Sequence, residues 1–327
     1  MKAVIFANSK FEGVNGKPKA LSVILGKTIL EYNCELIGNM VDEIIAVYPG
    51  EKGEFTPDIN KVTFCSEEEF YGNKIKTLNE TTVFMDGSIF YTCNMKKIID
   101  FHKNSASKIT VVLSCIRDSF LLPVSFEGDS IVKMKSDTKW SFNNLYILEK
   151  EMIGINVKRC IRKPTENILS VYPTKEKIYP VNNVWDLMKI SFELINKTHS
   201  FVHKSTFVDE SAEISRLSYV GKNCKIGKFV KIGAYTVIED NCIIKDGADI
   251  KYSMICENSY VGRSSEIEFS FVMENSTIGD RCILQGGNVV GRNFVVCNDS
   301  VVEKNTSVEE SEDKTDKKEK NKGKILK

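Results

Sequence analysis

Cysteine and histidine, two side chains that catalyse reactions and bind metals, form no recognisable motif in this sequence. The chain has ten cysteines and three histidines in 327 residues, and the cysteines form no C-x-x-C pair. Because the N-terminus lacks the pattern of a secretory signal, we expect a cytoplasmic protein with free thiols rather than disulfides. Cys224, Cys242 and Cys282 should be small fillers of a protein interior, not metal ligands.

The polar residues of interest lie at turns and at the ends of predicted strands. They are Lys19, after the glycine-containing loop 8–17, Asp86-Gly87-Ser88, directly after a strand at 81–85, Lys135, and Asn143, which begins a strand at 143–148. By residue type alone, they are a surface lysine, a loop-capping aspartate and a strand-end asparagine, so any other role needs a further argument.

The first part of the chain alternates predicted strands and helices. Strands are expected at 2–7, 43–48, 61–65, 81–85 and 109–115, shorter ones at 121–126, 130–135 and 143–148, and helices at 29–38, after Thr28, and from Asn94 to 102. This alternation predicts a Rossmann-like α/β domain with a mainly parallel sheet over 1–181. We expect the acidic segment 67–73 to be a loop. Residues 161–180, with three prolines, should be irregular.

From residue 201 onward, an aliphatic residue recurs every six positions, starting at Val202 and ending near Val308. Two steps, from 250 to 255 and from 267 to 272, are shortened to five. A hexapeptide period is the signature of a parallel β-helix, which we predict over 201–308. Glycine often follows the aliphatic residue, and we place these glycines at corners. A connecting helix at 182–200 precedes the coil, and a charged tail at 309–327 should be disordered.

One face of this coil should carry an apolar stripe. Side chains alternate along a strand, so the residue before each inward aliphatic faces outward. On one of the three faces all six of these residues are apolar or aromatic, namely Phe201, Tyr219, Val237, Met254, Phe271 and Val289. A stripe of this length is expected to be covered. Either another subunit, in a homo-oligomer such as a trimer or in a hetero-oligomer, or the chain's own helix and tail could cover it.

The order of these parts, together with three segments, resembles the sugar-1-phosphate nucleotidylyltransferases that carry a C-terminal left-handed β-helix. The segments are MKAVIFA at the start, GKPKALSVILGKTILEY at 16–32 and VNNVWDLMKISFELI at 181–195. The closest resemblance is to the archaeal-type enzymes that make UDP-N-acetylglucosamine or dTDP-glucose. It implies the reaction of a nucleoside triphosphate with a sugar-1-phosphate, assisted by Mg²⁺, to give a nucleotide sugar and pyrophosphate.

The resemblance also assigns expected roles to individual positions. Lys19 matches a lysine that contacts phosphates, and Asn143 matches an asparagine that contacts the sugar. Lys135 matches the lysine of an E-K-P segment whose glutamate is missing here. Gly87-Ser88 stands where the family has a glycine and a metal-binding aspartate, which leaves Asp86 as a candidate metal ligand only if the backbone re-aims it. Pro180 occupies the position of the second metal-binding aspartate.

With both metal carboxylates missing, we expect nucleotidyl transfer to be weak or lost and a nucleotide-sugar binding or regulatory role to remain. Mg²⁺ is expected only if the chain is catalytic. The alternative is a non-catalytic scaffold subunit of a hetero-oligomer. Acetyl transfer, known from bifunctional relatives, is not expected because no histidine lies beyond His203 to act as general base. The net charge of +1 gives no reason to expect nucleic acid or a membrane as partner.

Overall fold

The computed structural model describes residues 1–10, 18–48, 61–115, 121–127, 130–133, 138–162, 168–198, 200–308 and 325–326. The chain divides into two compact units. We call residues 1–22 with 28–182 the α/β unit, and residues 23–27 with 183–327 the coil unit. In the described residues, no helix is both long and apolar enough to cross a membrane.

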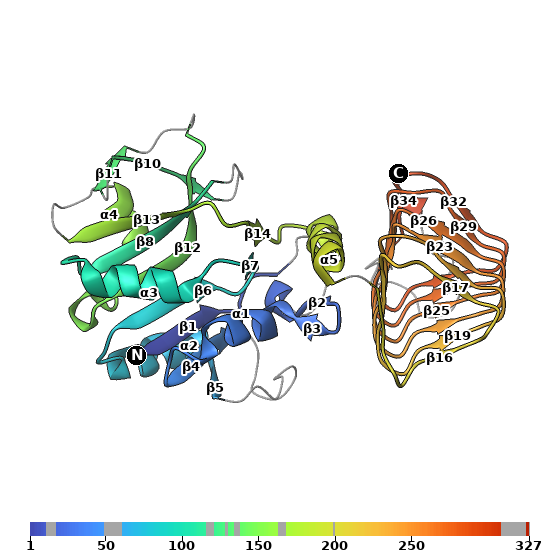
Figure 1. The fold of residues 1–327 in the computed structure, drawn as a ribbon, viewed down its shortest axis with the longest axis horizontal. Coiled ribbons are helices and arrows are strands. Elements are labelled where there is room, and N and C mark those ends of the chain that lie inside the picture. Colours follow the sequence, from blue (N-terminus) through green and yellow to red (C-terminus); the bar gives the residue numbers. More distant parts are fainter. Residues whose placement is uncertain are drawn as a thin grey trace, which may run out of the picture. The chain divides into compact units, whose positions relative to one another are not determined.

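A twisted, mainly parallel sheet forms the centre of the α/β unit (Figure 1). Its strands, in spatial order, are β13 (Leu169–Thr174), β8 (Ile109–Ser114), β12 (Ser141–Leu148), β6 (Thr82–Asp86), β1 (Lys2–Phe6), β4 (Glu43–Tyr48) and β5 (Val62–Ser66), with β9 (Leu122–Pro123) beside β12. Strand β12 is antiparallel to both of its long neighbours, and the remaining pairs along this order are parallel. Two buried clusters of apolar side chains cover the sheet.

Smaller elements complete the α/β unit. They are the helices α1 (Ile29–Gly38), α2 (Glu67–Gly72), α3 (Met95–Asn104) and α4 (Val157–Arg162), the 3₁₀ helices η1 (Lys19–Leu21), η2 (Lys74–Thr77) and η3 (Lys150–Met152), and the paired strands β7 (Ile89–Tyr91) with β14 (Ile178–Pro180) and β10 (Ser125–Glu127) with β11 (Ser130–Lys133). Thr28 and Asn94 cap α1 and α3, as predicted, because each side chain accepts a hydrogen bond from the N–H three residues later.

Two predictions of irregular structure are wrong. The acidic segment 67–73 forms α2 and its C-cap. The Ser66 side chain accepts from the Glu69 N–H, and the three glutamates lie in the first turn, where the helix dipole favours negative charge. Residues 161–180 contain the end of α4 and the strands β13 and β14. Pro173 is tolerated in β13 because this strand lies at the edge of the sheet.

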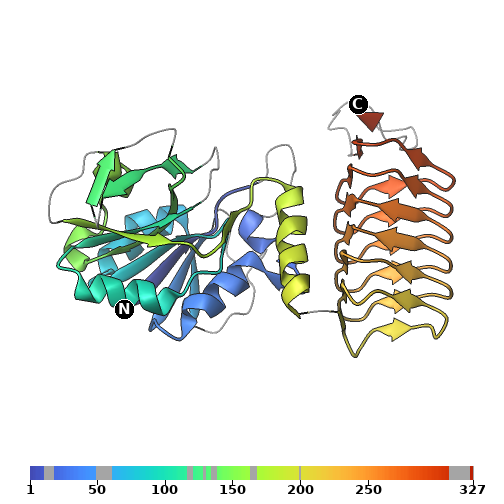
Figure 2. The same ribbon diagram turned by 45° about the horizontal axis from the view of Figure 1, so that its top comes forward.

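The coil unit contains the predicted parallel β-helix, whose strands stack in three sheets (Figure 2). The first sheet has β15 (Phe201–Val202), β18 (Ser218–Val220), β21 (Thr236–Ile238), β24 (Met254–Ile255), β27 (Ser270–Val272), β30 (Asn288–Val290) and β33 (Ser307–Val308). The second has β16 (Phe207–Val208), β19 (Lys225–Ile226), β22 (Ile243–Ile244), β25 (Tyr260–Val261), β28 (Thr277–Ile278) and β31 (Val295–Val296). The third has β17 (Glu213–Ile214), β20 (Lys231–Ile232), β23 (Asp249–Lys251), β26 (Glu266–Glu268), β29 (Ile283–Leu284) and β32 (Val301–Val302).

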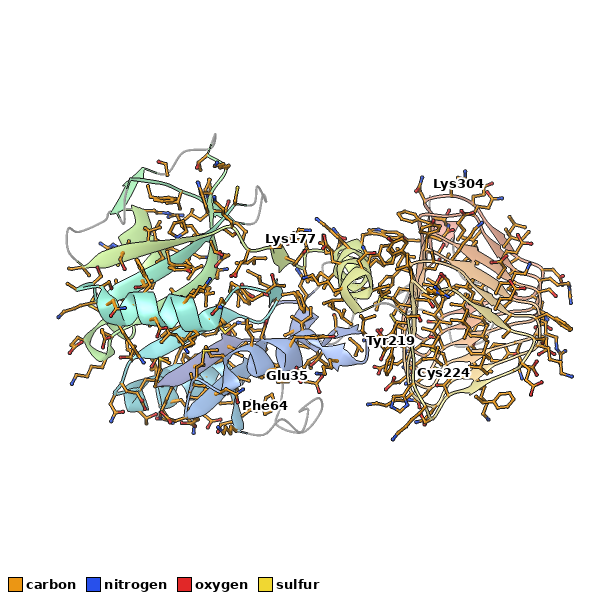
Figure 3. All side chains as sticks on the ribbon, in the orientation of Figure 1. Glu35, Phe64, Lys177, Tyr219, Cys224 and Lys304 are labelled. Atoms are coloured by element: carbon orange, nitrogen blue, oxygen red, sulfur yellow. The ribbon has the colours of Figure 1, made fainter. Side chains whose placement is uncertain are left out.

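The aliphatic residues of the hexads fill the interior of the coil. Cys224, Cys242 and Cys282 join them as the predicted small fillers, and Cys224 is labelled in Figure 3. Both five-residue steps keep the register of the first sheet, because Val237 pairs with Met254 and Met254 with Phe271.

Glycine has a different role at the corners from the one we predicted. Gly221 and Gly227 do not have a positive φ; the left-handed corner positions are held by several residue types, of which asparagine is the commonest, as at Asn223 and Asn241. A Cβ atom on Gly221 would lie 2.9 Å from the backbone nitrogen of Asp240 in the next turn. These glycines therefore permit the close approach of successive turns, and the asparagines supply the turn conformation.

The connecting helix α5 (Val184–Thr198) directly precedes the coil in the chain. The short strands β2 (Val23–Ile24) and β3 (Lys27–Thr28) pair with each other. Within the coil unit, Trp185 of α5 stacks on Phe269, with ring centroids 5.4 Å apart. The predicted disordered tail lies outside the described residues, except that Ile325–Leu326 (β34) pairs antiparallel with β33.

Candidate functional site

A cavity of about 460 Å³ lies in the α/β unit where β1 and β6 end and β12 begins. In the sheet order β5-β4-β1-β6, the strands β4 and β5 lie on one side of β1, and β6, which follows them in the chain, lies on the other side. Ligands of open α/β sheets bind beyond the carboxyl ends of the strands at such a switch point. We call this the strand-end cavity; its lining residues are Phe6, Asn8, Tyr71, Met85, Asp86, Phe142, Asn144, Tyr146, Gly154, Ile155, Asn156, Val157 and Lys158.

Asp86, the last residue of β6, lines this cavity, and both of its carboxylate oxygens accept hydrogen bonds. One oxygen accepts from the backbone N–H of Ser88 at 2.9 Å and from the Ser88 hydroxyl at 2.6 Å. The other accepts from the side-chain amide of Asn144 at 3.0 Å. Asp86 therefore caps its own turn, as its residue type suggested, and is tied to β12 as well.

Asn143 and Asn144 lie at an irregularity in β12, where the pairing with β8 shifts between Phe142 and Tyr146. Asn144 adopts the left-handed conformation, with φ of 56°, and its side chain lines the cavity. Asn143, the expected sugar contact, is fully buried, and its side-chain oxygen accepts from the Leu145 N–H at 3.2 Å. The irregularity turns the neighbouring residue toward the cavity, which residue spacing alone does not reveal.

Gly87 and Ser88, the expected substrate contacts, follow Asp86 in the turn after β6 and are not among the described lining residues. The Gly87 N–H donates to the Phe6 carbonyl at 2.8 Å. A Cβ atom on Gly87 would lie 2.9 Å from this carbonyl oxygen and 3.2 Å from the Ala20 Cβ. Glycine is therefore needed for the ends of β1 and β6 to meet.

Neither of the two expected lysines is among the described residues that line the cavity. Lys19, half-buried at the start of η1, is not among the described lining residues, although its N–H donates to the carbonyl of Ser9 at 2.8 Å. Lys135 lies outside the described residues. The cation that does line the cavity is Lys158, at the start of α4. Sequence reasoning missed it because this region carries no motif of the resembled family.

Aromatic side chains give the cavity an apolar wall. Tyr146 stacks on Phe84, with ring centroids 5.0 Å apart and ring planes 9° apart. Burial raises the pKa of Tyr146, and the nearby Asp86 raises it further, so its hydroxyl stays protonated at neutral pH. Tyr71, on α2, is exposed at the mouth of the cavity. The cavity thus combines flat aromatic surface with amides and one cation.

These residues do not fit a divalent metal ion held by the protein. Among the described lining residues, Asp86 is the only carboxylate, and its oxygens already accept three hydrogen bonds. The described parts of the chain contain no group of three histidine, cysteine or acidic residues placed to hold a metal. Mg²⁺ commonly takes one or two carboxylates together with substrate phosphates. The described lining residues by themselves offer one carboxylate, Asp86, so we derive no catalytic step through a metal.

In the coil unit, the residues of the apolar stripe lie side by side on successive strands of one face, as the sequence predicts. Tyr219 pairs in register with Phe201 and with Val237, and the pairing continues through Met254 and Phe271. In the single chain, however, most of the stripe is already buried. The exposed fractions are 8% for Tyr219, 0% for Val237, 1% for Met254 and 2% for Phe271, against 45% for Phe201, and Val289 is half-buried. Tyr219 is labelled in Figure 3.

One protein-family model and one known protein are similar to this chain. The family model described as "GMPPB C-terminal domain" matches residues 225–322. A protein named "Putative mannose-1-phosphate guanyltransferase" from Sulfolobus acidocaldarius is 23% identical over 224 residues, which are 59% of this chain and 62% of that protein. The chain therefore matches less than two thirds of this relative's length. Both matches confirm the resemblance to sugar-1-phosphate nucleotidyltransferases, from which this chain is divergent.

Proposed function

We propose that the α/β unit binds a guanosine nucleotide sugar, or the guanosine nucleotide and hexose-1-phosphate that form one, in the strand-end cavity. We further propose that the chain transfers nucleotidyl groups weakly or not at all. The guanosine and mannose chemistry is suggested by the name of the Sulfolobus acidocaldarius protein. The observation that carries the proposal of weak transfer is the hydrogen bonding of Asp86, the carboxylate that lines the cavity. One of its oxygens accepts from the Ser88 hydroxyl and the other from the Asn144 amide.

The argument for weak catalysis is electrostatic. Nucleotidyl transfer builds negative charge around the attacked phosphorus, and positioned metal ions and cations supply most of its stabilisation. In the described cavity, the charged groups are one hydrogen-bonded carboxylate and Lys158, whereas the resemblance implies two metal-binding carboxylates. Pro180, at the second expected acidic position, lies in β14 and has no side-chain ligand atom. A site of this kind can hold a charged ligand better than it can stabilise the transition state.

The argument for binding comes from the remaining side chains. A nucleobase or a sugar ring can pack on Tyr71 and Tyr146, and the amide of Asn144 can donate to or accept from ring substituents. Lys158 supplies a positive charge for a phosphate group. A ligand that spans these groups would close the cavity over Asp86 without requiring a metal ion.

A thermal unfolding panel tests the binding. We expect GDP-mannose, GTP or mannose-1-phosphate to raise the melting temperature more than UTP, ATP and UDP-N-acetylglucosamine, since a ligand at 100 times its dissociation constant adds about 2.7 kcal/mol. The double variant Tyr146→Ala/Lys158→Ala should lose this shift. The matched control Tyr260→Ala/Lys245→Ala removes a similar pair from the coil, where the lysine lies over the ring. No shift with any nucleotide would contradict the proposal.

Pyrophosphate release tests the weak catalysis separately. With Mg²⁺, each of the four nucleoside triphosphates and a panel of hexose-1-phosphates, we expect a rate near the uncatalysed background. Robust, protein-dependent release of pyrophosphate would show that the chain is an active enzyme and would overturn this part of the proposal.

The second candidate function is a non-catalytic subunit of an oligomer. The regular coil favours it, because apolar side chains at its surface remain exposed, including Phe201 at 45% and Phe207 at 63%. Partner subunits of the same architecture would supply the activity. A stable complex of defined stoichiometry with an active nucleotidyltransferase chain would support this role.

A further inference from the structure

A second cavity, of about 970 Å³, lies within the coil unit between helix α5 and one corner of the coil. We call it the helix–coil cavity. Its helical side is formed by six residues of one face of α5, spaced three and four positions apart: Trp185, Met188, Lys189, Phe192, Glu193 and Asn196. The described lining residues all belong to the coil unit.

The coil side of the cavity is built from equivalent corner residues of successive turns. They are Tyr235, Tyr252, Phe269, Gly287 and Asn305. Each lies two positions before a residue of the first sheet, in the row that pairs in register from Val237 to Ser307. Turns of a parallel coil are about 4.8 Å apart, and the rings of Tyr235 and Tyr252 stack with their centroids 5.9 Å apart. We call the first three residues the aromatic ladder, which ends where Gly287 has no side chain.

The residues of the aromatic ladder have a backbone conformation that suits them poorly. Tyr235, Tyr252 and Phe269 have positive φ, of 52°, 49° and 41°. Asparagine is better suited to this conformation, and at the corner between the first and second sheets it holds the equivalent position from Asn223 to Asn293. Strain of this kind clusters at functional sites. The three rings therefore need a reason other than the turn itself.

Packing against α5 does not account for all of this aromatic surface. Trp185 stacks on Phe269, with ring centroids 5.4 Å apart, and the centroids of Phe192 and Tyr235 are 5.2 Å apart. Tyr252, which lies between these two contacts along the ladder, is nevertheless 43% exposed, and Phe269 is 51% exposed. The helix thus touches both ends of the ladder and leaves Tyr252 open to the cavity.

The polar groups of the cavity carry no net charge. The formal charges of Lys189 and Glu193 cancel, and the amides of Asn196 and Asn305 and the Ser307 hydroxyl are neutral. A phosphate ligand would need an excess of positive charge, and an organic cation is usually held by aromatic rings with an excess of negative charge. Aromatic faces beside neutral donors and acceptors instead suit a ligand with an apolar ring face and hydroxyl groups at its edge.

We propose that the helix–coil cavity binds an uncharged carbohydrate, whose sugar ring packs on Tyr252 and Phe269 while its hydroxyl groups bond to Asn196 and Asn305. A pyranose ring has this combination, because its axial C–H groups form an apolar face and its hydroxyl groups project from the rim. The volume suits a short oligosaccharide, since small-molecule sites span about 300–1,000 Å³. The helix–coil cavity shares no described lining residue with the strand-end cavity, so this inference does not rest on the proposed function.

Tryptophan fluorescence of the full chain tests the binding. The chain has two tryptophans; Trp185 lines the cavity, and Trp140 lies against Phe126 in the α/β unit. In Trp140→Phe, we expect titration with mannotriose or maltotriose to change the Trp185 emission in a saturable way. Glycerol, which has hydroxyl groups but no ring, should cause no such change, and neither should GTP after correction for its absorbance.

The same titrations give the results that would overturn the inference. These are no saturable change with either trisaccharide, an equal change with glycerol, or a saturable response to GTP alone. The GTP arm also separates the two sites, because nucleotide binding in the strand-end cavity is measured by the thermal shift and does not require a response of Trp185.

Calorimetric titration of variants tests the aromatic ladder itself. Tyr252→Ala/Phe269→Ala removes two exposed rings and should weaken binding of the trisaccharide by about tenfold, with an unchanged circular dichroism spectrum. Phe229→Ala is the matched control, because Phe229 is also an exposed aromatic corner residue with positive φ, of 56°, but is not among the described lining residues. Undiminished binding by the double variant, or an equal loss in Phe229→Ala, would contradict the proposal.

Ser307→Trp keeps the test decisive if the double variant does not fold. Ser307 is exposed and lines the cavity, so a tryptophan there should fill the space and abolish binding while the ladder stays intact. Light scattering distinguishes a sugar from a protein occupant. We expect both variants to keep the molecular mass of the wild type, and a lower mass would show that a second copy of the chain occupies the cavity instead.

Discussion

Gly87 lies where the ends of β1 and β6 approach one another most closely, directly after the cavity residue Asp86. A Cβ at this position would meet two groups of β1 and its end, the Phe6 carbonyl oxygen at 2.9 Å and the Ala7 Cα at 3.2 Å, and neither is a flexible side-chain end. We therefore expect Gly87→Ala to lower the free energy of unfolding by about 1–3 kcal/mol, the usual cost of overpacking, in urea denaturation.

Gly72 provides the matched control for this substitution. It ends α2, is exposed, and would have no atom within 4 Å of an added Cβ. Gly72→Ala should be neutral or slightly stabilising, since it reduces the freedom of the unfolded chain. Equal effects of the two substitutions would contradict the close packing that the structure gives to Gly87.

At the residue scale, local rules were enough to place Asp86 at the end of its strand, where it lines the cavity. Asp86 follows a strand that its own apolar residues define, so its place at the sheet edge could be predicted locally. The choice between Asn143 and Asn144 depended on an irregular pairing of β12 with β8, which is a property of two distant segments. Lys158 carried no local signal, because its position depends on how α4 packs against the sheet.

At the scale of the elements, α3, β8 and β13 are joined by a buried polar network around His102. One ring nitrogen of His102 lies 2.8 Å from the Thr110 hydroxyl, and the other lies 3.0 Å from a carboxylate oxygen of Glu149. The Thr110 hydroxyl continues to Ser170 of β13 at 2.9 Å. Such a network stabilises the fold only while each of its groups is satisfied.

This network should make the stability of the α/β unit depend on pH. Burial lowers the pKa of His102, while its bond to Glu149 raises it, with a net shift below 6.5. The neutral ring is thus favoured in the folded state, so its contribution is complete above pH 6.5 and is lost as the pH falls through the lowered value. We expect the free energy of unfolding of the wild type to decrease on acidification across this window.

The substitution His102→Gln should remove this part of the pH dependence, because glutamine keeps hydrogen-bonding atoms but does not titrate. His203→Gln, in a turn of the coil where the ring contacts Ser205, is the control and should keep it. Chemical denaturation at a series of pH values, followed by circular dichroism, measures both. An unchanged profile in His102→Gln would mean that other groups cause the acid sensitivity.

The elements that the sequence predicted well are those specified by local rules. Thr28 and Asn94 fix the starts of α1 and α3 by capping, and the apolar run of β8 marks a central strand. Segment 67–73 was predicted as a loop because its charge suggested solvent, whereas the Ser66 cap and the buried Phe70 make it helical. Residues 169–174 were predicted as irregular because Pro173 disfavours a central strand, and only the sheet order shows an edge.

At the scale of the whole molecule, the coil was predictable because its period is local and repeats in every turn. The residues that cover its apolar stripe were not predictable. Gly26 lies against Tyr219 of the stripe, and Glu239 of the coil accepts hydrogen bonds from the N–H groups of Leu25 and Gly26. These two residues are 214 and 213 positions away from Glu239 along the chain. No periodicity in either segment indicates such a pairing. The stripe is consequently less available to another subunit than its sequence implies.

Phe201 is the member of the stripe that remains exposed, so the predicted coil-mediated oligomer is tested best at this position. Aspartate at Met254 or Phe271, which are 1% and 2% exposed, would bury a charge and unfold the coil, and any change in mass would then be ambiguous. We expect the wild-type chain to elute as an oligomer in size-exclusion chromatography with light scattering, and Phe201→Asp to shift it to the mass of a single chain with an unchanged circular dichroism spectrum. Phe229→Asp, which alters a corner residue outside the stripe that is 69% exposed, should leave the mass of the oligomer unchanged. If Phe201→Asp retains the oligomer, or if Phe229→Asp disrupts it, the subunits associate through another face of the coil. The stripe then packs only against the chain's own residues 23–27 and helix α5.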